Sequence, residues 1–208
     1  MIKNICLIVL VLFILLSVLS CSKKLNRELA TKIITEENIY PKDIRYTIYT
    51  DHVVFDSRYN KIFARTIAGG RTGHTRSGFN IEIYNVLDST GVIEMVKMGN
   101  INKTLTAYII YITKKGKRFM LGKHRPLGEP FENVRLKACE LIFKEITSIT
   151  FSKGKNPTAT AECMCYYGNY SPFVTSSETL KKEFVGKSRT DIVRFKFYKG
   201  EGWQIVYR

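Results

Sequence analysis

The chain has 208 residues, of which 45% are hydrophobic, and a formal net charge of +15 at pH 7. This length excludes anything larger than one domain or two small ones, and the apolar fraction is ordinary for a globular protein. The excess of basic residues favours an anionic partner, although a basic surface can also serve solubility alone.

The first twenty residues differ in character from the rest. Lys3 is the only charged residue before an apolar run, Ile5–Leu19, which Ser17 alone interrupts. A positive start, an apolar core and small residues before a cleavage point are typical of a secretory signal peptide. As a helix this run would be about 22 Å long, and it falls short of the roughly 20 residues that cross a bilayer core. We therefore expect residues 1–20 to be a signal peptide, with an uncleaved membrane anchor as the alternative.

The apolar run ends in Val18-Leu19-Ser20-Cys21. This sequence resembles the lipobox of bacterial lipoproteins, in which an aliphatic residue stands three before the cysteine and a small residue directly before it. The resemblance implies cleavage before Cys21, a diacylglycerol on its sulfur and acylation, typically by palmitate, of the new amino terminus. Two or three acyl chains make a stable anchor. Residues 21–24 would then be a lipidated tether.

The expected location changes which partners the positive charge favours. Ser22 and Lys23 follow the cysteine without the aspartate that retains many lipoproteins in the inner membrane, so the resemblance implies the outer membrane, facing the periplasm. Nucleic acid, which the charge alone would suggest, is therefore not expected. The expected partners are the membrane, through the lipid anchor, and an anionic lipid or polysaccharide or an envelope protein.

The pattern from residue 25 is first helical. Leu25, Leu29 and Ile33 predict a helix that ends by Asn38, and alternation over residues 44–48 predicts a short strand. Two more helices are expected, one from Asp56 or Ser57 and one that ends at Gly91. Their apolar faces would be Tyr59, Ile62, Phe63 and Ile67 in the first and Phe79, Ile83, Val86 and Leu87 in the second.

Residues 84–93 together with residues 111–117 resemble a winged helix-turn-helix. In that family a helix ends in a leucine and a glycine, a two-stranded wing follows, and an isoleucine-threonine-x-x-glycine turn closes it, here Ile112-Thr113 to Gly116. The resemblance covers roughly residues 57–121. It implies an interaction module rather than DNA binding, because the third helix carries Glu82 and Asp88 and few basic residues.

The remainder of the chain reads as strands. Residues 122–133 are rich in glycine and proline and are expected to be a linker. Strands are predicted at 134–143, 146–152 and 158–167, a short helix at 178–184, and a hairpin that turns at 199–202. The predicted fold is α+β, with N-terminal helices and a winged-helix-like hairpin over residues 25–121 and a C-terminal antiparallel sheet over residues 134–208. Pro172-Phe173 and the closing Gly202-Trp203 resemble the end of small envelope lipoproteins, a likeness that implies no defined activity.

Two groups of basic residues are candidate sites. The glycine-rich loop 69–78 opens a helix and could hold an anion through Arg71, His74 and Arg76, or could be a flexible connection only. A second cluster could form a basic surface or a solvated face: Lys114, Lys115, Lys117, Arg118, Lys123 and Arg125.

The cysteines and histidines do not predict a metal or a cofactor. Cys139 could form a disulfide with Cys163 or Cys165, or all three could be buried thiols. His52, His74 and His124 have no partner at metal-ligand spacing, and no serine lies in a nucleophile elbow. We therefore expect a binding or scaffolding module, with no catalytic set identified. The alternatives are a periplasmic enzyme acting on an anionic envelope polymer, or a protein that neutralises a toxin or inhibitor.

Overall fold

The computed structural model describes residues 24–64, 78–152 and 157–207. The chain divides into two units. The first unit contains the described residues up to 40 together with 143–165 and those from 188 onward, and the second contains 41–142 and 166–187. Two long strands, β7 (Phe131–Ser152) and β8 (Thr158–Gly168), contribute residues to both units.

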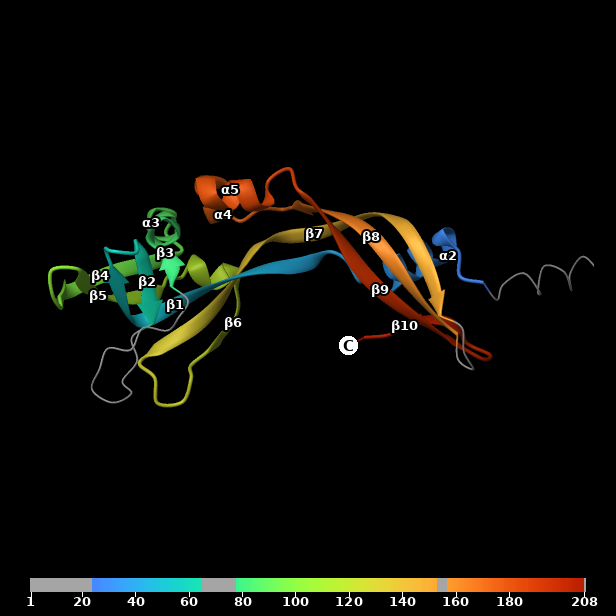
Figure 1. Ribbon diagram of the computed structural model, residues 1–208, viewed down its shortest axis with the longest axis horizontal. Helices are drawn as coiled ribbons and strands as arrows, with labels where there is room; N and C mark the ends of the chain where they lie inside the picture. The colour runs from blue at the N-terminus through green and yellow to red at the C-terminus, as the bar shows by residue number, and fades with distance from the viewer. Residues whose placement is uncertain (1–23, 65–77, 153–156, 208) are drawn as a thin grey trace, which may run out of the picture. The chain divides into compact units, whose positions relative to one another are not determined.

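In its described residues the first unit has one helix and a set of strands in the order β10-β9-β8-β7 (Figure 1). The N-cap of helix α2 (Arg27–Glu36) is Asn26, whose side chain accepts a hydrogen bond from the backbone N–H of Leu29 at 2.8 Å. Strands β9 (Ser188–Tyr198) and β10 (Gly202–Ile205) form an antiparallel hairpin. Side chains along β8 point alternately to opposite faces of the sheet. The buried ones in this unit are Ala159, Ala161, Cys163 and Cys165.

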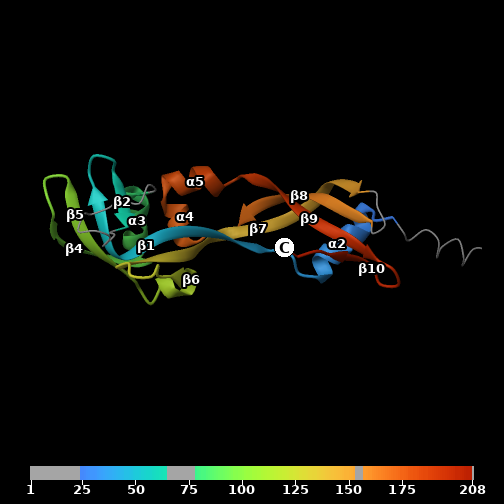
Figure 2. The same cartoon turned by 60° about the horizontal axis from the view of Figure 1, so that its bottom comes forward.

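The second unit is built around β1 (Lys42–Asp56), which pairs antiparallel with β2 (Lys61–Ala64), β5 (Leu105–Ile112) and β7. The other strand pairs are β2 with β3 (Phe79–Asn80), β4 (Ile93–Asn100) with β5, and β6 (Met120–His124) with β7. The helical segments are α3 (Ile81–Ser89), the 3₁₀ turn η3 (Gly116–Phe119), α4 (Pro172–Ser176) and α5 (Glu178–Phe184). Figure 2 shows the same elements from a second direction.

One hydrophobic core joins the helices of the second unit to its sheet. It includes Ile83 and Leu87 from α3, Phe173 from α4 and Leu180 from α5, all at most 1% exposed. Burial of a large apolar side chain contributes about 1.5–3 kcal/mol. The packing of α3, α4 and α5 on the strands therefore holds β1, β5 and β7 in place around the site described below.

The predicted fold class is wrong. From residue 42 the chain is mainly antiparallel sheet, and the described residues contain four short α-helices that are interspersed among the strands. The expected helix at 57–67 is absent from its described part, where β1 continues to Asp56 and residues 61–64 form β2. The hairpin β4–β5 exists, but β5 also pairs with β1, so it is part of the main sheet and not the wing of a winged helix.

Several individual elements agree with their predictions. Helix α2 ends before Asn38, α5 occupies residues 178–184, and the hairpin turn near Gly200 lies where it was expected. The strands predicted at 134–143 and 146–152 are one strand, β7. The segment 122–133 contains the end of β6 and the start of β7 and lies within the second unit.

Among the helices of the described residues, none has the length and apolar character needed to span a bilayer.

Candidate functional site

The candidate site lies where β1 changes partner. From Lys42 to Asp51 this strand is in register with β7, and from Asp51 to Asp56 it is in register with β5. Tyr111 and Ile112 extend beyond the pairing with β1 and pair with β4. This divergence leaves a pocket of about 340 Å³, which we call the branch pocket. It is lined by Thr50, Asp51, Ile110, Tyr111, Ile112, Lys117, Met120, Lys123 and Glu132.

The backbone at the branch is unusual. Asp51 has a φ of +60°, in the left-handed region that residues with a side chain rarely adopt. The other three non-glycine residues with positive φ in the described chain are asparagines outside strands, so Asp51 is the one non-glycine residue with this geometry in a described strand. Such conformations cost on the order of 1–3 kcal/mol and occur often at functional sites. Aspartate is among the side chains that tolerate this region best.

The neighbouring Thr50 carries an unsatisfied polar atom. The residue is only 2% exposed, and its Oγ1 has no hydrogen-bond partner among the residues that the structure describes. A buried hydroxyl without a partner costs roughly 1–3 kcal/mol. Thr50 lines the branch pocket, so a group that enters the pocket and reaches this hydroxyl would find it without a partner among the described residues.

The carboxylates of the branch pocket are already paired with cations. Arg125 forms an ion pair with Asp51 and a second one, at 3.4 Å, with Glu132, while Lys123 Nζ lies 3.2 Å from Glu132. The side chains of Asp51 and Glu132 are 28% and 16% exposed. Lys117 also lines the pocket, and no ion pair involving it occurs within the described part of the chain.

The structure divides the basic cluster that the sequence suggests. Lys117 and Lys123 line the branch pocket and Arg125 reaches its carboxylates, whereas Lys114, Lys115 and Arg118 are exposed outside its lining. Lys115 donates a hydrogen bond at 2.7 Å to the carbonyl of Thr90, at the end of α3. A lysine there interacts favourably with the carbonyl end of the helix. Arg71, His74 and Arg76 lie outside the described residues.

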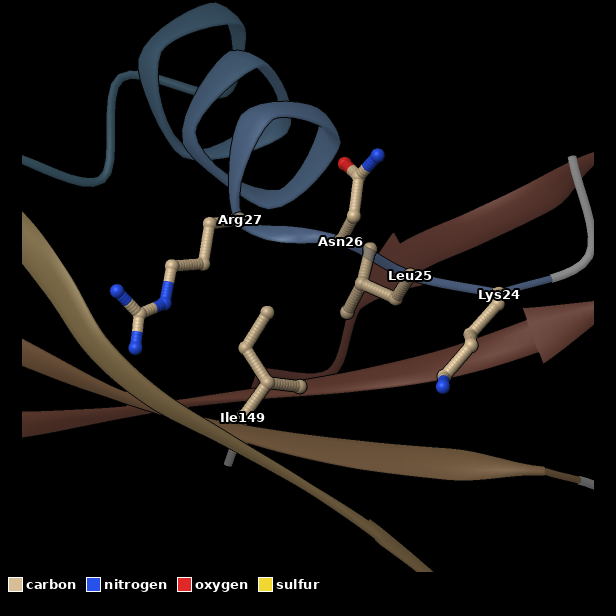
Figure 3. Close-up of a pocket in the computed structure, with 5 residues that line it drawn as sticks. All are labelled: Lys24, Leu25, Asn26, Arg27 and Ile149. Atoms are coloured by element: carbon tan, nitrogen blue, oxygen red, sulfur yellow. The ribbon is translucent and has the colours of Figure 1, made fainter.

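A second, shallow pocket of about 520 Å³ lies at the start of α2 in the first unit (Figure 3). Leu25 points toward Ile149 there and is only 2% exposed. Two cations contact the strand β7 nearby: the Arg27 guanidinium donates to the carbonyl of Thr147 at 2.5 Å, and Lys24 Nζ lies 5.9 Å from the ring centre of Phe151. Both side chains are otherwise exposed. Cys21, four residues before Leu25, lies outside the described residues.

The described cysteines are all buried, Cys139 in the second unit and Cys163 and Cys165 in the first. Cys139 is a free thiol. Burial, with the nearby charges of Glu183 and Glu140, raises the pKa of the Cys139 thiol to about 11. In the first unit, Tyr40 donates a hydrogen bond at 2.6 Å to Asp191, and burial together with that carboxylate raises the pKa of Tyr40 well above its ordinary value. Over residues 24–64, 78–152 and 157–207, no group of three or more potential ligands is placed to hold a metal ion.

Of the nine residues that line the branch pocket, the sequence predicts only Lys117 and Lys123 as site residues. It does not predict the hydroxyl of Thr50 or the carboxylates of Asp51 and Glu132. One signal for them is present in β1. Its aliphatic residues before Asp51 alternate, at Ile44 and Ile48, whereas the apolar residues after it, Val53, Val54 and Phe55, are consecutive. Since side chains alternate with period two, this loss of alternation indicates that the surroundings of the strand change near Asp51, although it does not identify the strands that meet there.

Comparison of the chain with protein-family models, curated proteins and solved structures gave no match.

Proposed function

We propose that the chain is a lipid-anchored protein of the bacterial outer membrane that faces the periplasm and acts as a binding or scaffolding module. The lipobox-like Val18–Cys21 supports the anchor. The observation that carries the proposal is the burial of Leu25, which is 2% exposed and is only the fourth residue after Cys21. Four residues span at most about 14 Å. An acylated Cys21 would therefore hold the first unit at the membrane surface.

The residues next to the tether suit such a position. Lys24 and Arg27 are exposed and contact β7 close to Leu25 (Figure 3). A basic side chain near an anionic membrane surface contributes about 1 kcal/mol of attraction. The two cations would reinforce the lipid anchor at anionic headgroups, and most of the folded chain would remain free to bind other envelope components.

Metabolic labelling tests the anchor. Cells that express the full chain are grown with an alkyne fatty acid, and the protein is detected after coupling to a fluorophore. We expect the native chain to be labelled and to fractionate with the outer membrane. Cys21→Ala should lose the label, whereas the matched variant Cys6→Ala should keep it because Cys6 is removed with the signal peptide. An unlabelled native chain, or a labelled Cys21→Ala variant, would overturn the anchor.

The binding role has its own test. Cells that carry the tagged native chain and cells that carry the tagged Cys21→Ala form are cross-linked. The tagged protein is purified from the envelope of each, and the material recovered with the two forms is compared. We expect an envelope protein or anionic polymer that is enriched with the native chain only. Equal recovery of everything by both forms would contradict an anchored binding module.

A further inference from the structure

We propose that the branch pocket of the second unit binds the carboxylate group of a small ligand that has a short apolar body. Three features of the pocket support this proposal. Within the described chain, Thr50 Oγ1 is a buried hydroxyl without a partner and Lys117 has no ion pair. The other lining residues include an apolar wall. Its volume of about 340 Å³ lies at the small end of the range for small-molecule pockets, roughly 300–1,000 Å³.

Two features select an anion. The Thr50 hydroxyl can donate a hydrogen bond, and the Lys117 ammonium carries three donors and no acceptor. The pocket's carboxylates, Asp51 and Glu132, are already compensated by Lys123 and Arg125. A cationic ligand would have to displace these pairs, whereas an anion uses the groups that remain.

The local charge favours a monoanion over a dianion. The site has two carboxylates and three cations, Lys117, Lys123 and Arg125, so its net charge is +1. A bound carboxylate would therefore neutralise it. A phosphate dianion would leave excess negative charge beside Asp51 and Glu132, and such repulsion is strong in a partly buried site.

The remaining lining residues define the ligand's body. Ile110 is fully buried, and Ile112 and Met120 pack against the core beside it. Tyr111 also lines the pocket and is 48% exposed. A wall of this kind accepts an alkyl chain or a small ring. Each buried methylene should contribute roughly 0.8 kcal/mol, equivalent to about a fourfold gain in affinity.

This site does not depend on the lipid anchor, because its residues all lie in the second unit. The full chain in detergent, labelled with ¹³C at isoleucine and methionine methyl groups, is titrated with acetate, butyrate and hexanoate at neutral pH. We expect saturable shifts of the Ile110, Ile112 and Met120 methyl signals, with affinity rising along the series. The uncharged analogue butyramide and inorganic phosphate should bind at least about tenfold more weakly.

Variants separate binding from stability. Thr50→Val keeps the shape but removes the hydroxyl, and it should weaken butyrate binding about five- to tenfold without lowering the unfolding midpoint, because Oγ1 has no partner to lose. Thr50→Ser should restore binding. Lys117→Gln should weaken it, whereas Lys114→Gln, outside the lining, should not. The proposal is overturned if no carboxylate gives saturable shifts, if Thr50→Val binds butyrate as the native chain does, or if butyramide binds equally well.

Discussion

Tyr84 links α3 to β1 through one hydroxyl. Its oxygen accepts a hydrogen bond from the backbone N–H of Tyr49 at 2.8 Å and donates one to the carbonyl of Tyr49 at 3.1 Å. Tyr84 is fully buried, so water cannot replace either bond. Tyr84→Phe removes both, and we expect a loss of about 1–3 kcal/mol in the free energy of unfolding, measured by urea denaturation. The control Tyr166→Phe, at an exposed tyrosine, should change little. Equal midpoints for Tyr84→Phe and the native chain would contradict this role.

The buried thiol of Cys139 permits a prediction about reactivity. Its pKa is raised to about 11 by burial and by the charges of Glu183 and Glu140. Only the thiolate reacts with alkylating reagents, so at pH 8 about one molecule in a thousand carries the reactive form. We expect iodoacetamide to leave Cys139 unmodified in the folded protein and to modify it fully after denaturation without reductant, as read by mass spectrometry of its peptide. A Cys139 that stays blocked in the denatured, unreduced protein would show that it forms a disulfide.

The elements differ in how far sequence alone predicts them. Helix α3 can be predicted from the sequence because Ile83 and Leu87 lie four residues apart and Asn80 can serve as its N-cap. The segment with Ile62 and Phe63 also fits helical spacing, yet these two residues and Ala64 are consecutive and all buried, since β2 is covered on both faces. A short apolar run of this kind does not distinguish a buried strand from a helix.

The turn between β5 and η3 makes a sharp test of packing between elements. Thr113 Oγ1 donates to the carbonyl of Gly91 at 2.6 Å and accepts from the N–H of Gly116 at 3.0 Å. A Cβ on Gly116 would lie 1.9 Å from the carbonyl oxygen of Val92, so the backbone would have to shift. We expect Gly116→Ala to lower the free energy of unfolding by at least about 1–3 kcal/mol, measured by thermal and urea denaturation. Lys114→Ala, in the same turn but exposed, is the control. An unchanged stability in Gly116→Ala would mean that the turn is not packed against Val92.

At the scale of the whole molecule, local patterns predict strands and helices better than they predict which strands meet. The basic character of Lys117, Lys123 and Arg125 is evident from the sequence. Their position around Thr50 and Asp51 depends on β1 pairing first with β7 and then with β5, which are contacts between residues about 50 to 100 positions apart. Such long-range pairing follows from the mutual fit of the strands and of the core beneath them, not from the pattern of any one segment.

The net charge leads to a prediction for the chain as a whole. The formal charge of +15 falls by only one unit when Lys3 is removed with the signal peptide, so a form that starts at Ser22 remains strongly basic without its lipid anchor. We expect this form to sediment with phosphatidylglycerol vesicles at about 0.05 M salt and to be released by about 0.5 M, because the Debye length shortens from roughly 14 Å to roughly 4 Å. Vesicles of neutral phosphatidylcholine, the matched control, should not bind it at either salt concentration. Binding that is equal on both kinds of vesicle, or unaffected by salt, would show that the positive charge does not draw the protein to anionic surfaces and serves solubility instead.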